Sequence, residues 1–335
     1  MMRRLVILFA LVGMLTAAVL SRNPAPKPVS FPDGKRFAFS IIDDTDLATL
    51  ERLRPIYDVL IRNGLRTTKT VWVLPTNHEA LDANRGDTLS DEAYRDFVLD
   101  LQRRGFEIAL HGVRGGSSDR ADILRGLEAF KAYVGRYPTM HMNHAQNRDN
   151  LYWGGFRYSF TPLRWLGNVA MSAKSFGHVP ESEHFWGDFA REHVKYVRQF
   201  TFNEVNLLKV NPSMPFRRED TPYVNFWFQT SNGANLDAFS ALLGPSQLDQ
   251  LEHEGGVCLV YAHLGAGSFN REEGLDPRFE SRIKDLASRN GWFAPASEIL
   301  DYLSRQPGWT GTLGLTERLR IESQFTVFRI RNGGA

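Results

Sequence analysis

Cysteine is nearly absent from this chain, since Cys258 is the single one among 335 residues. One thiol excludes an internal disulfide and a metal site built from several thiolates. The chain also lacks an excess of one charge, with 40 basic and 38 acidic residues. The first 27 residues hold four of the basic residues and no acid, so 36 basic residues remain against 38 acids. A nucleic-acid-binding protein needs a clustered basic excess, so nucleic acid is not expected as a partner.

One long apolar run, Leu5–Leu20, follows Arg3 and Arg4. Its length lies between the core of a signal peptide and a membrane span of about 20 residues. Residues 1–20 are therefore predicted to be a signal peptide or an N-terminal membrane anchor, and 21–34 an extended proline-rich linker. Basic residues stay on the cytoplasmic side. We therefore expect the rest of the chain to be exported (periplasmic, secreted or anchored), with membrane contact only through this segment.

Strand-like apolar stretches alternate with segments of helical spacing after the linker. Strands are expected at about 36–43, 69–74, 106–110 and 139–143, and the strand Val257–Ala262 continues the pattern. A clear helix is expected from about 119 to 134. Such alternation indicates right-handed crossovers and a parallel sheet or barrel.

Local signals also mark the ends of the first helices. Asp44, Thr45 and Asp46 follow the first strand and are candidates to cap the next helix, Asp46 most of all. Pro55 lies inside that helix and predicts a kink or two shorter helices. Ser90 is expected to cap the helix before the third strand.

The second half of the chain is less regular. Residues 148–250 are rich in aromatic side chains and read as an irregular insertion after strand four. Residues 35–310 are predicted to form one α/β domain, an irregular (β/α) barrel of mostly parallel strands. Residues 311–335 are expected to be a C-terminal tail with a strand at Gln324–Ile330.

Acidic and histidine side chains stand at the ends of several predicted strands. The first strand ends in Asp43 and Asp44, and later apolar stretches end near His111, His144 and His263. An unpaired carboxylate is costly to bury, so the two acids belong at the strand's exit. Reactive groups gather at the carboxyl ends of parallel strands. The pattern therefore predicts one metal-assisted active site.

Alternation along a strand separates neighbouring side chains. Asp43 and Asp44 would point to opposite sides, so one can bind a metal while the other faces a bound water. His141 and His144 would also face opposite sides, which favours His144 as a ligand and His141 as a core residue. His263, from a separate strand, suits a general acid.

One carboxylate with His111 and His144 fits a single divalent ion that keeps open positions for water, and zinc is the ion most favoured. Ferrous oxygenases use the same ligand types. The α/β pattern and the order Asp, His, His favour hydrolysis.

Several side chains near His144 are candidates to bind a sugar. Asn143 and Asn147 offer amides to sugar hydroxyls, Arg148 adds a charge, and Tyr152 and Trp153 offer flat apolar faces. The alternatives are that these aromatic residues belong to the core and that Arg148 forms a surface ion pair with Asp149.

Over most of 36–305 the chain resembles the polysaccharide deacetylase superfamily, whose catalytic unit is the NodB-homology domain. Its first motif, a strand that ends in two aspartates, matches Asp43 and Asp44. Its last motif is similar to Val260–His263. The resemblance implies a deacetylase-type (β/α) barrel with a general base at Asp43, a metal ligand at Asp44 and a general acid at His263.

Other motifs of the superfamily are only partly kept. The second motif supplies two histidines four residues apart; His111 matches the first, but Gly115 takes the second place. Either His144 replaces the missing ligand, or metal binding is weak or lost. The superfamily's Arg-x-Pro-Tyr motif has no convincing match, and Met214–Arg217 is only distantly similar to it. The chain is thus identified as a divergent member.

The resemblance implies a metal-dependent hydrolase that removes N- or O-acetyl groups from a cell-envelope or extracellular polysaccharide. One alternative is an inactive glycan-binding or scaffold protein, since Gly115 replaces a ligand. A second is a glycoside hydrolase that pairs Asp43 with Asp149 or Glu181. A metallophosphoesterase is a more distant alternative, and the oligomeric state is left open.

Overall fold

The computed structural model describes residues 23, 29–78, 85–170, 175–271 and 274–332. The expected signal peptide or anchor at 1–20 and most of the expected linker lie outside them. None of the helices within the described residues has the length and apolar character that crossing a membrane requires.

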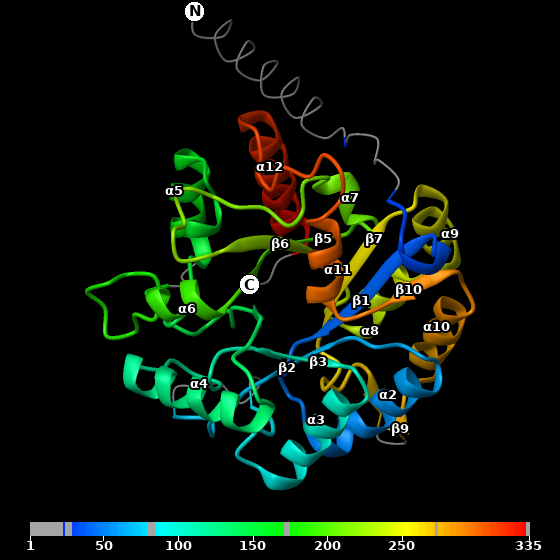
Figure 1. Cartoon of the computed structure of the whole chain (residues 1–335), viewed down its shortest axis with the longest axis horizontal. Coiled ribbons are helices and arrows are strands. Elements are labelled where there is room, and N and C mark those ends of the chain that lie inside the picture. Colours follow the sequence, from blue (N-terminus) through cyan, green and yellow to red (C-terminus); the bar gives the residue numbers. More distant parts are fainter. Residues whose placement is uncertain (1–22, 24–28, 79–84, 171–174, 272–273, 333–335) are drawn as a thin grey trace, which may run out of the picture.

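Parallel strands close into a barrel (Figure 1), as the sequence predicted. They pair in chain order, and the seventh pairs back to the first. The barrel strands are β1 (Phe37–Asp43), β2 (Thr68–Val71), β3 (Glu107–Leu110), β4 (Met140–His141), β5 (Tyr196–Phe202), β6 (Phe226–Asn232) and β7 (Val257–Ala262). A further strand, β10 (Gly291–Phe293), pairs with the start of β1, and β8 (Asn270–Arg271) and β9 (Gly274–Leu275) form a small antiparallel pair.

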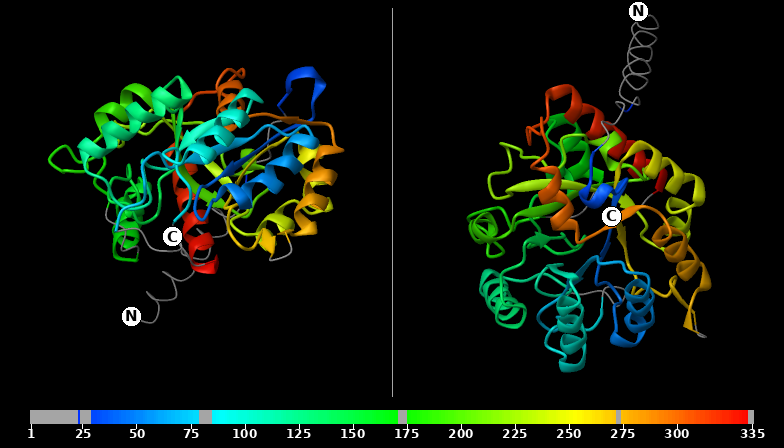
Figure 2. Two further views of the ribbon diagram at one scale, coloured as in Figure 1. Left: turned by 90° about the horizontal axis from the view of Figure 1, so that it is seen from below. Right: turned by 45° about the vertical axis from the view of Figure 1, so that its right-hand side comes forward.

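Helices follow most strands and surround the barrel. Figures 1 and 2 show α2, α3 and α4 side by side along its outside. The helices are α2 (Leu50–Arg62), α3 (Glu92–Arg103), α4 (Arg120–Val134), α5 (Thr161–Ala170), α6 (Gly187–His193), α7 (Leu207–Val210), α8 (Leu236–Leu242), α9 (Pro245–Glu254), α10 (Pro277–Ala287), α11 (Ala296–Leu303) and α12 (Leu315–Asn332), with 3-10 turns η1 (Pro32–Gly34) and η3 (Gly154–Arg157).

Strand β1 is buried on both faces, and its two faces meet different surroundings. Ile41 belongs to the apolar layer between the barrel and the surrounding helices. Ile42 belongs to the inner cluster, together with Leu300 of α11. Because successive side chains alternate, Asp43 follows the outward set and Asp44 the inward set.

Helix α11 lies at the N-terminal end of the barrel. The backbone N–H of Ala296 donates to Thr68 Oγ1 at 2.9 Å, and that of Ser297 donates to Glu107 Oε2 at 3.2 Å. Thr68 and Glu107 are the first residues of β2 and β3. The carboxyl ends of the strands, at the opposite end, are left to carry the functional site.

The expected strand at Gln324–Ile330 is wrong, because this segment is the second half of helix α12. The alternation of apolar residues there is short and fits either structure. Phe325 stacks on Phe200 of β5, with ring centroids 4.1 Å apart. Packing of the helix against β5 therefore decides the structure of this segment.

Three local expectations also fail. Helix α2 is one unbroken run through Pro55, held by its buried apolar face, so the expectation of two helices is wrong. Its cap is Thr49, whose hydroxyl accepts from Arg52 N, rather than a residue at 44–46. Ser90 donates to Val73 O, and Asp91 takes the N-cap position of α3.

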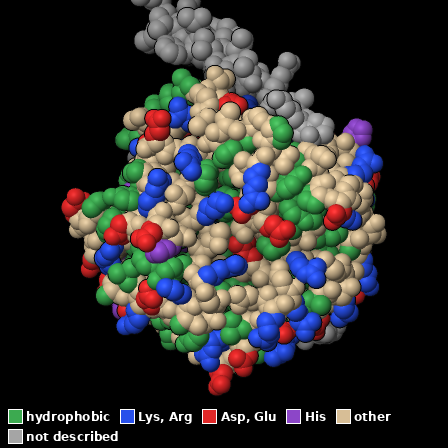
Figure 3. All heavy atoms as spheres, viewed as in Figure 1, with side chains coloured by type: hydrophobic (Ala, Val, Ile, Leu, Met, Phe, Trp, Pro, Cys, Tyr) green, Lys and Arg blue, Asp and Glu red, His purple; other side chains and the backbone are tan. Residues whose placement is uncertain are grey.

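The aromatic-rich region 148–250 is more regular than expected, because it contains β5 and β6. Many of its aromatic residues are core: Trp186 and Trp227 are among the largest fully buried side chains. On the face drawn in Figure 3, basic and acidic side chains are intermingled.

Candidate metal centre

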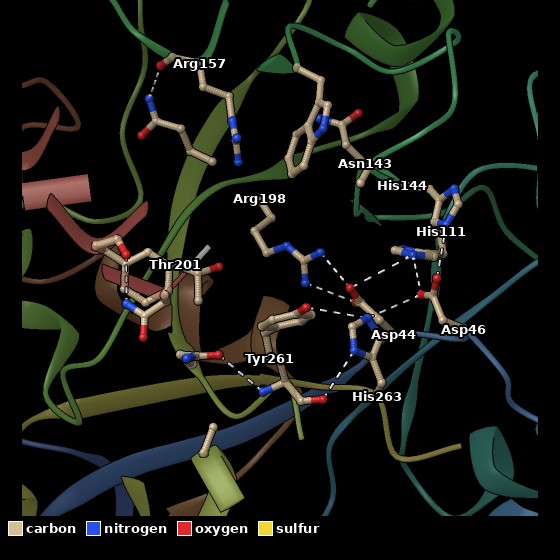
Figure 4. Close-up of a pocket in the computed structure, with 18 of the residues that line it drawn as sticks. Asp44, Asp46, His111, Asn143, His144, Arg157, Arg198, Thr201, Tyr261 and His263 are labelled. Carbon is tan, nitrogen blue, oxygen red and sulfur yellow. Dashed lines mark hydrogen bonds and ion pairs between the residues drawn. The ribbon is translucent and has the colours of Figure 1, made fainter. Parts of the chain in front are cut away.

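A cavity of about 540 Å³ opens at the carboxyl ends of the strands (Figure 4). It is lined by Asp44, Asp46, His111, Asn143, His144, Ala145, Gln146, Trp153, Arg157, Arg198, Gln199, Thr201, Asn232, Ala234, Asn235, Ala238, Tyr261, His263, Phe325, Phe328 and Asn332. Its lining is mostly polar and comes from both halves of the barrel and from α12.

Three imidazoles surround the carboxylate of Asp46. Its Oδ1 lies 3.0 Å from His144 Nε2, and its Oδ2 lies 3.1 Å from His111 Nε2 and 3.5 Å from His263 Nε2. The ligand atoms of Asp46, His111 and His144 all lie within 4.8 Å of one another. The predicted histidines His111 and His144 thus come together, and Asp46 is the acid between them.

The turn after β1 brings Asp46 into this position. Asp44 N still donates to Ala262 O at 2.8 Å, so β1 stays paired with β7 at its exit. Leu47 has a φ of 56°, a left-handed conformation that is uncommon for a non-glycine residue. Because Thr49 caps α2, the expectation that Asp46 caps this helix is wrong, and its carboxylate faces the histidines.

Hydrogen bonds on the far side of two rings fix their orientation. His144 Nδ1 lies 2.9 Å from Asn147 Oδ1, and His263 Nδ1 lies 3.3 Å from Ala234 O. Asn147 Nδ2 donates to the backbone carbonyl of Arg114, which identifies the atom facing His144 as the amide oxygen, an acceptor. Ala234 O is a backbone carbonyl and also accepts. Each Nδ1 therefore carries a proton, and each Nε2 faces Asp46.

Burial lowers the pKa of His144, but the hydrogen bond and the charge of Asp46 outweigh it and raise that pKa. Without a metal ion the ring can therefore donate from Nε2 to Asp46, and as a neutral ring it can offer the same nitrogen to a metal ion. Burial by itself raises the pKa of Asp46, but hydrogen bonds from His111 and His144 outweigh it and hold that pKa well below the usual value. The group is therefore an anion. Nδ1 of His111 is buried and has no hydrogen-bond partner among the described residues. A carboxylate oxygen and two imidazole nitrogens are donors of a zinc-type site, and the His144 ring has the outer hydrogen bond that is typical of such ligands, so the residues fit a divalent ion.

Asp44 lies beside this cluster but is bound to another group. Arg198 of β5 donates to both of its oxygens, at 3.0 and 2.6 Å. Asp44 Oδ2 lies 3.9 Å from His111 Nε2. Burial raises the pKa of Asp44, but the charge and hydrogen bonds of Arg198, together with the charges of His111 and His263, outweigh this and lower that pKa. Asp44, which the sequence predicted as a metal ligand, thus lines the cavity as an ionised carboxylate in a bidentate ion pair with Arg198.

Asp43 lies on the other side of the barrel wall and does not line the cavity. Its Oδ2 accepts from Tyr57 of α2 at 2.9 Å and pairs with Lys69 Nζ at 3.0 Å. Its Oδ1 accepts from Leu264 N at 3.0 Å. The side chains of Asp43 and Lys69 are fully buried. This carboxylate links β1, β2 and α2 and has no access to the cavity.

His263 reaches the cavity from the end of β7 and is partly exposed there. Its Nε2 lies 3.5 Å from the hydroxyl of Tyr261 as well as near Asp46. The Arg198 guanidinium lies over the Tyr261 ring, 4.6 Å from its centroid. Asp44, Arg198, Tyr261 and His263 therefore form a second polar group beside the candidate ligands (Figure 4).

The residues predicted to bind sugar take different places. Trp153 lines the cavity. Asn143 also lines it, but its side chain is bonded to His141 and to both backbone polar groups of Leu151. Asn147 holds His144 from behind and accepts from Gly116 N.

Arg148 and Tyr152 do not line the cavity. Arg148 is exposed. Tyr152 is buried with a φ of 48° and lies against His178, with ring centroids 4.0 Å apart. Asp149 is buried and accepts from Ser118 N, so the alternative of a surface ion pair between Arg148 and Asp149 is wrong.

The acids considered for a glycoside hydrolase lie apart from the cavity. Asp149 is buried, Glu181 is exposed, and neither lines it. The acids that line the cavity are Asp44 and Asp46, and each is already bound to cationic or imidazole partners. The geometry therefore gives no support to an acid pair across a sugar.

Two site residues were missed by the sequence analysis. Asp46 has a weak signal, because it is the third acid within four residues after an apolar strand. Arg198 has a stronger one, because it is the one charged residue inside the almost fully buried strand Tyr196–Phe202. A buried cation in a barrel strand predicts a buried anion nearby, but the sequence does not say which.

Comparison with known proteins supports the fold. No protein-family profile matches the sequence, and no curated protein matches it closely enough to count as a relative. Among solved structures, a probable polysaccharide deacetylase from Pseudomonas aeruginosa PAO1 is similar, with 11% identity, a TM-score of 0.53, and coverage of 85% of this chain and 96% of that one. One from Mycobacterium smegmatis has 14% identity, a TM-score of 0.48, and coverage of 87% and 98%. Puue allantoinase has 13% identity and a TM-score of 0.49, and the match covers 87% of this chain and 96% of that one.

The similarity to the Pseudomonas structure defines a class of fold. The chain resembles the polysaccharide deacetylases in its barrel, at the low identity expected of a divergent member. The comparison therefore shows a shared barrel fold, and fold alone does not define an activity.

Proposed function

We propose that this protein is a metal-dependent hydrolase that removes acetyl groups from a polysaccharide. The observation that supports this best is the convergence of the Nε2 atoms of His111 and His144 on the Asp46 carboxylate, inside a cavity at the carboxyl ends of the barrel strands. The fold of the Pseudomonas deacetylase-like structure supports the same class.

Asp46, His111 and His144 would hold the ion, and zinc suits this donor set best. A divalent ion in such a site polarises a carbonyl and lowers the pKa of a bound water. His144 then takes the place of the second-motif histidine that Gly115 lacks. Asn147 keeps the His144 ring in the orientation that this role needs.

Asp44 is the best candidate for the general base. Among the cavity's two carboxylates, it is the one that does not lie between His111 and His144, and Arg198 keeps it ionised. We assign the role to Asp44 rather than to Asp43, because Asp43 is sealed outside the barrel wall.

His263 is the candidate for the general acid. It comes from β7 and is more exposed to the cavity than His111 or His144. A protonated Nε2 there can donate to the leaving amine or alcohol as the acyl bond breaks. The Nδ1 bond to Ala234 O holds the ring in place.

Amide side chains suit a hydroxyl-rich substrate. Gln146, Asn232 and Asn235 line the cavity, and Trp153 adds an aromatic face. These groups support a glycan bearing N- or O-acetyl groups as the substrate class.

The test is acetate release from acetylated oligosaccharides by the full chain, with and without a chelator and added zinc. We expect release that the chelator abolishes and zinc restores. His144→Gln should lose it, whereas His253→Gln, an exposed histidine on α9, should not. Tight oligosaccharide binding without bound metal or acetate release would favour the inactive glycan-binding alternative.

We also propose that the chain is exported through its apolar N-terminal run. A reporter that is active only outside the cytoplasm, fused after residue 34, tests this. Loss of reporter activity when residues 1–20 are deleted is the expected result.

A further inference from the structure

Exposed apolar side chains are concentrated on two helices. Among the described residues six large apolar side chains are exposed: Leu315, Val327 and Ile330 on α12, Phe160 and Trp165 just before and within α5, and Tyr133 on α4. Ile330 is 79% exposed and Trp165 is 64% exposed. Apolar residues that are exposed singly are ordinary on a protein surface, whereas a concentration of them marks an interaction site.

Hydrogen bonds and packing join α5 to α12. The buried Glu322 of α12 accepts from the backbone N–H of Ser159 at 2.7 Å and from that of Phe160 at 3.1 Å. Leu163 of α5 and Phe328 of α12 pack against the same apolar cluster. Figures 1 and 2 show the two helices next to each other. We use the name α5–α12 surface for the exposed residues Phe160, Trp165, Val327 and Ile330.

The first described residue of the chain is bound to α12 as well. Asn23 Oδ1 accepts from Arg320 Nη1 and from Gln324 Nε2, both at 2.9 Å. Val327 follows Gln324 by three residues and Arg320 by seven, so the three side chains lie on one face of the helix.

Chain length then limits where the apolar N-terminal run can end. The run Leu5–Leu20 stops three residues before Asn23. A chain extends by at most about 3.6 Å per residue, so Leu20 lies within about 11 Å of Asn23. The end of the run is therefore close to α12.

The charges at the end of α12 suit a lipid surface. Arg329 and Arg331 adjoin Ile330, and the helix has no acidic residue after Glu322. Glu322 itself is buried against the start of α5. Exposed apolar residues, flanking arginines and a tryptophan on the neighbouring helix are the side chains that favour the interface of a bilayer with anionic lipids.

We propose that the N-terminal run is retained as a membrane anchor and that the α5–α12 surface lies on the same bilayer. Because the anchor leaves the protein at α12, this helix lies close to the membrane. Turning the α5–α12 surface towards the lipid removes its apolar side chains from water. Phe325, Phe328 and Asn332 of the same helix line the cavity, so docking holds the cavity next to the membrane surface.

Lipid quenching of single labelled cysteines tests the proposal. Cys258 is fully buried, so Ile330→Cys and Val327→Cys can each be labelled selectively with a thiol-reactive, environment-sensitive fluorophore. The labelled full chain is reconstituted in vesicles of phosphatidylcholine and phosphatidylglycerol, with and without a lipid that carries a nitroxide quencher near its headgroup. Tyr133→Cys, at the one exposed large apolar residue outside α5 and α12 among the described residues, is the matched control.

We expect the nitroxide lipid to remove about half or more of the emission at positions 330 and 327, because an interfacial helix buries its apolar face about 5–10 Å into the boundary of headgroups and acyl chains. The label at position 133 should keep its emission. Unchanged emission at 330 and 327 overturns the docking, and so does equal quenching at 133.

Two further results would also contradict the proposal. Emission at 330 that resists the nitroxide but shifts with the protein-to-lipid ratio would show that a second copy of the chain covers this surface. An exported chain whose intact mass shows that it begins after residue 20 would contradict the retained anchor. Both readouts are independent of acetate release, so their failure leaves the proposed hydrolysis untouched.

Discussion

Asp43 and Asp44 are adjacent, fully buried and each paired with a cation, yet they lie on opposite sides of the barrel wall. Asp43 meets Lys69 and Tyr57 in the layer beneath α2. Asp44 meets Arg198 in the cavity, 3.9 Å from a candidate metal ligand. The two ion pairs are chemically alike, and they differ in that Asp44 lines the cavity whereas Asp43 does not. We therefore propose that the outer pair stabilises the fold and that the inner pair takes part in the proposed reaction.

The largest effect is expected at the centre of the cavity. Asp46→Asn should abolish both metal binding and acetate release, because it removes the charged member of the ligand set. Metal content after dialysis and acetate release measure the two effects. Asp58→Asn, an exposed carboxylate on α2, should change neither. Full metal content in Asp46→Asn would remove this residue from the ligand set.

The inner pair is tested by Asp44→Asn. Because a general base is lost, we expect kcat to fall by about 10²–10⁴-fold, while the metal stays bound. The measurement is kcat per bound metal ion. An unchanged kcat would contradict the assignment of Asp44 as the base.

The outer pair should behave in the opposite way. Asp43→Asn leaves Lys69 buried without its partner and should cost about 3–5 kcal/mol in the free energy of unfolding. The kcat of the folded, metal-loaded protein should stay near that of the wild type. Urea unfolding measures the first effect, and Lys69→Met in the same chain should restore part of it. A fall in kcat equal to that of Asp44→Asn would instead support the assignment of Asp43 as the base.

A third buried acid gives the smallest effect. Burial raises the pKa of Asp149 from 3.8 to about 6. The folded state thus holds this proton more tightly than the unfolded state, and stability is lost as pH rises from about 4 to above 6. The total penalty is about 3 kcal/mol for about two pKa units.

Asp149→Asn removes this titration. The variant should gain stability over the wild type, and the gain should be about 1 kcal/mol larger at pH 7.5 than at pH 5. Urea unfolding at the two pH values measures it. An equal difference at both pH values would mean that Asp149 does not titrate in this range.

The regular half of the barrel was predictable, because β1, β3 and α4 carry strong apolar periodicity and lie where the sequence placed them. The helical structure of residues 324–330 was not predictable, because it depends on the packing of Phe325 against Phe200. In the site, the histidines at strand ends were recognisable from position alone. The choice between Asp44 and Asp46 was not, because it depends on Arg198, which lies 154 residues further along the chain.

Zinc-edge anomalous diffraction from crystals grown with zinc tests the central claim most directly. The account predicts one strong peak about 2.0–2.2 Å from the Nε2 atoms of His111 and His144 and from an oxygen of Asp46, with the Asp44–Arg198 pair intact. No peak between these three side chains at saturating zinc, or a peak held by Asp44 with Asp46 turned away, would contradict it.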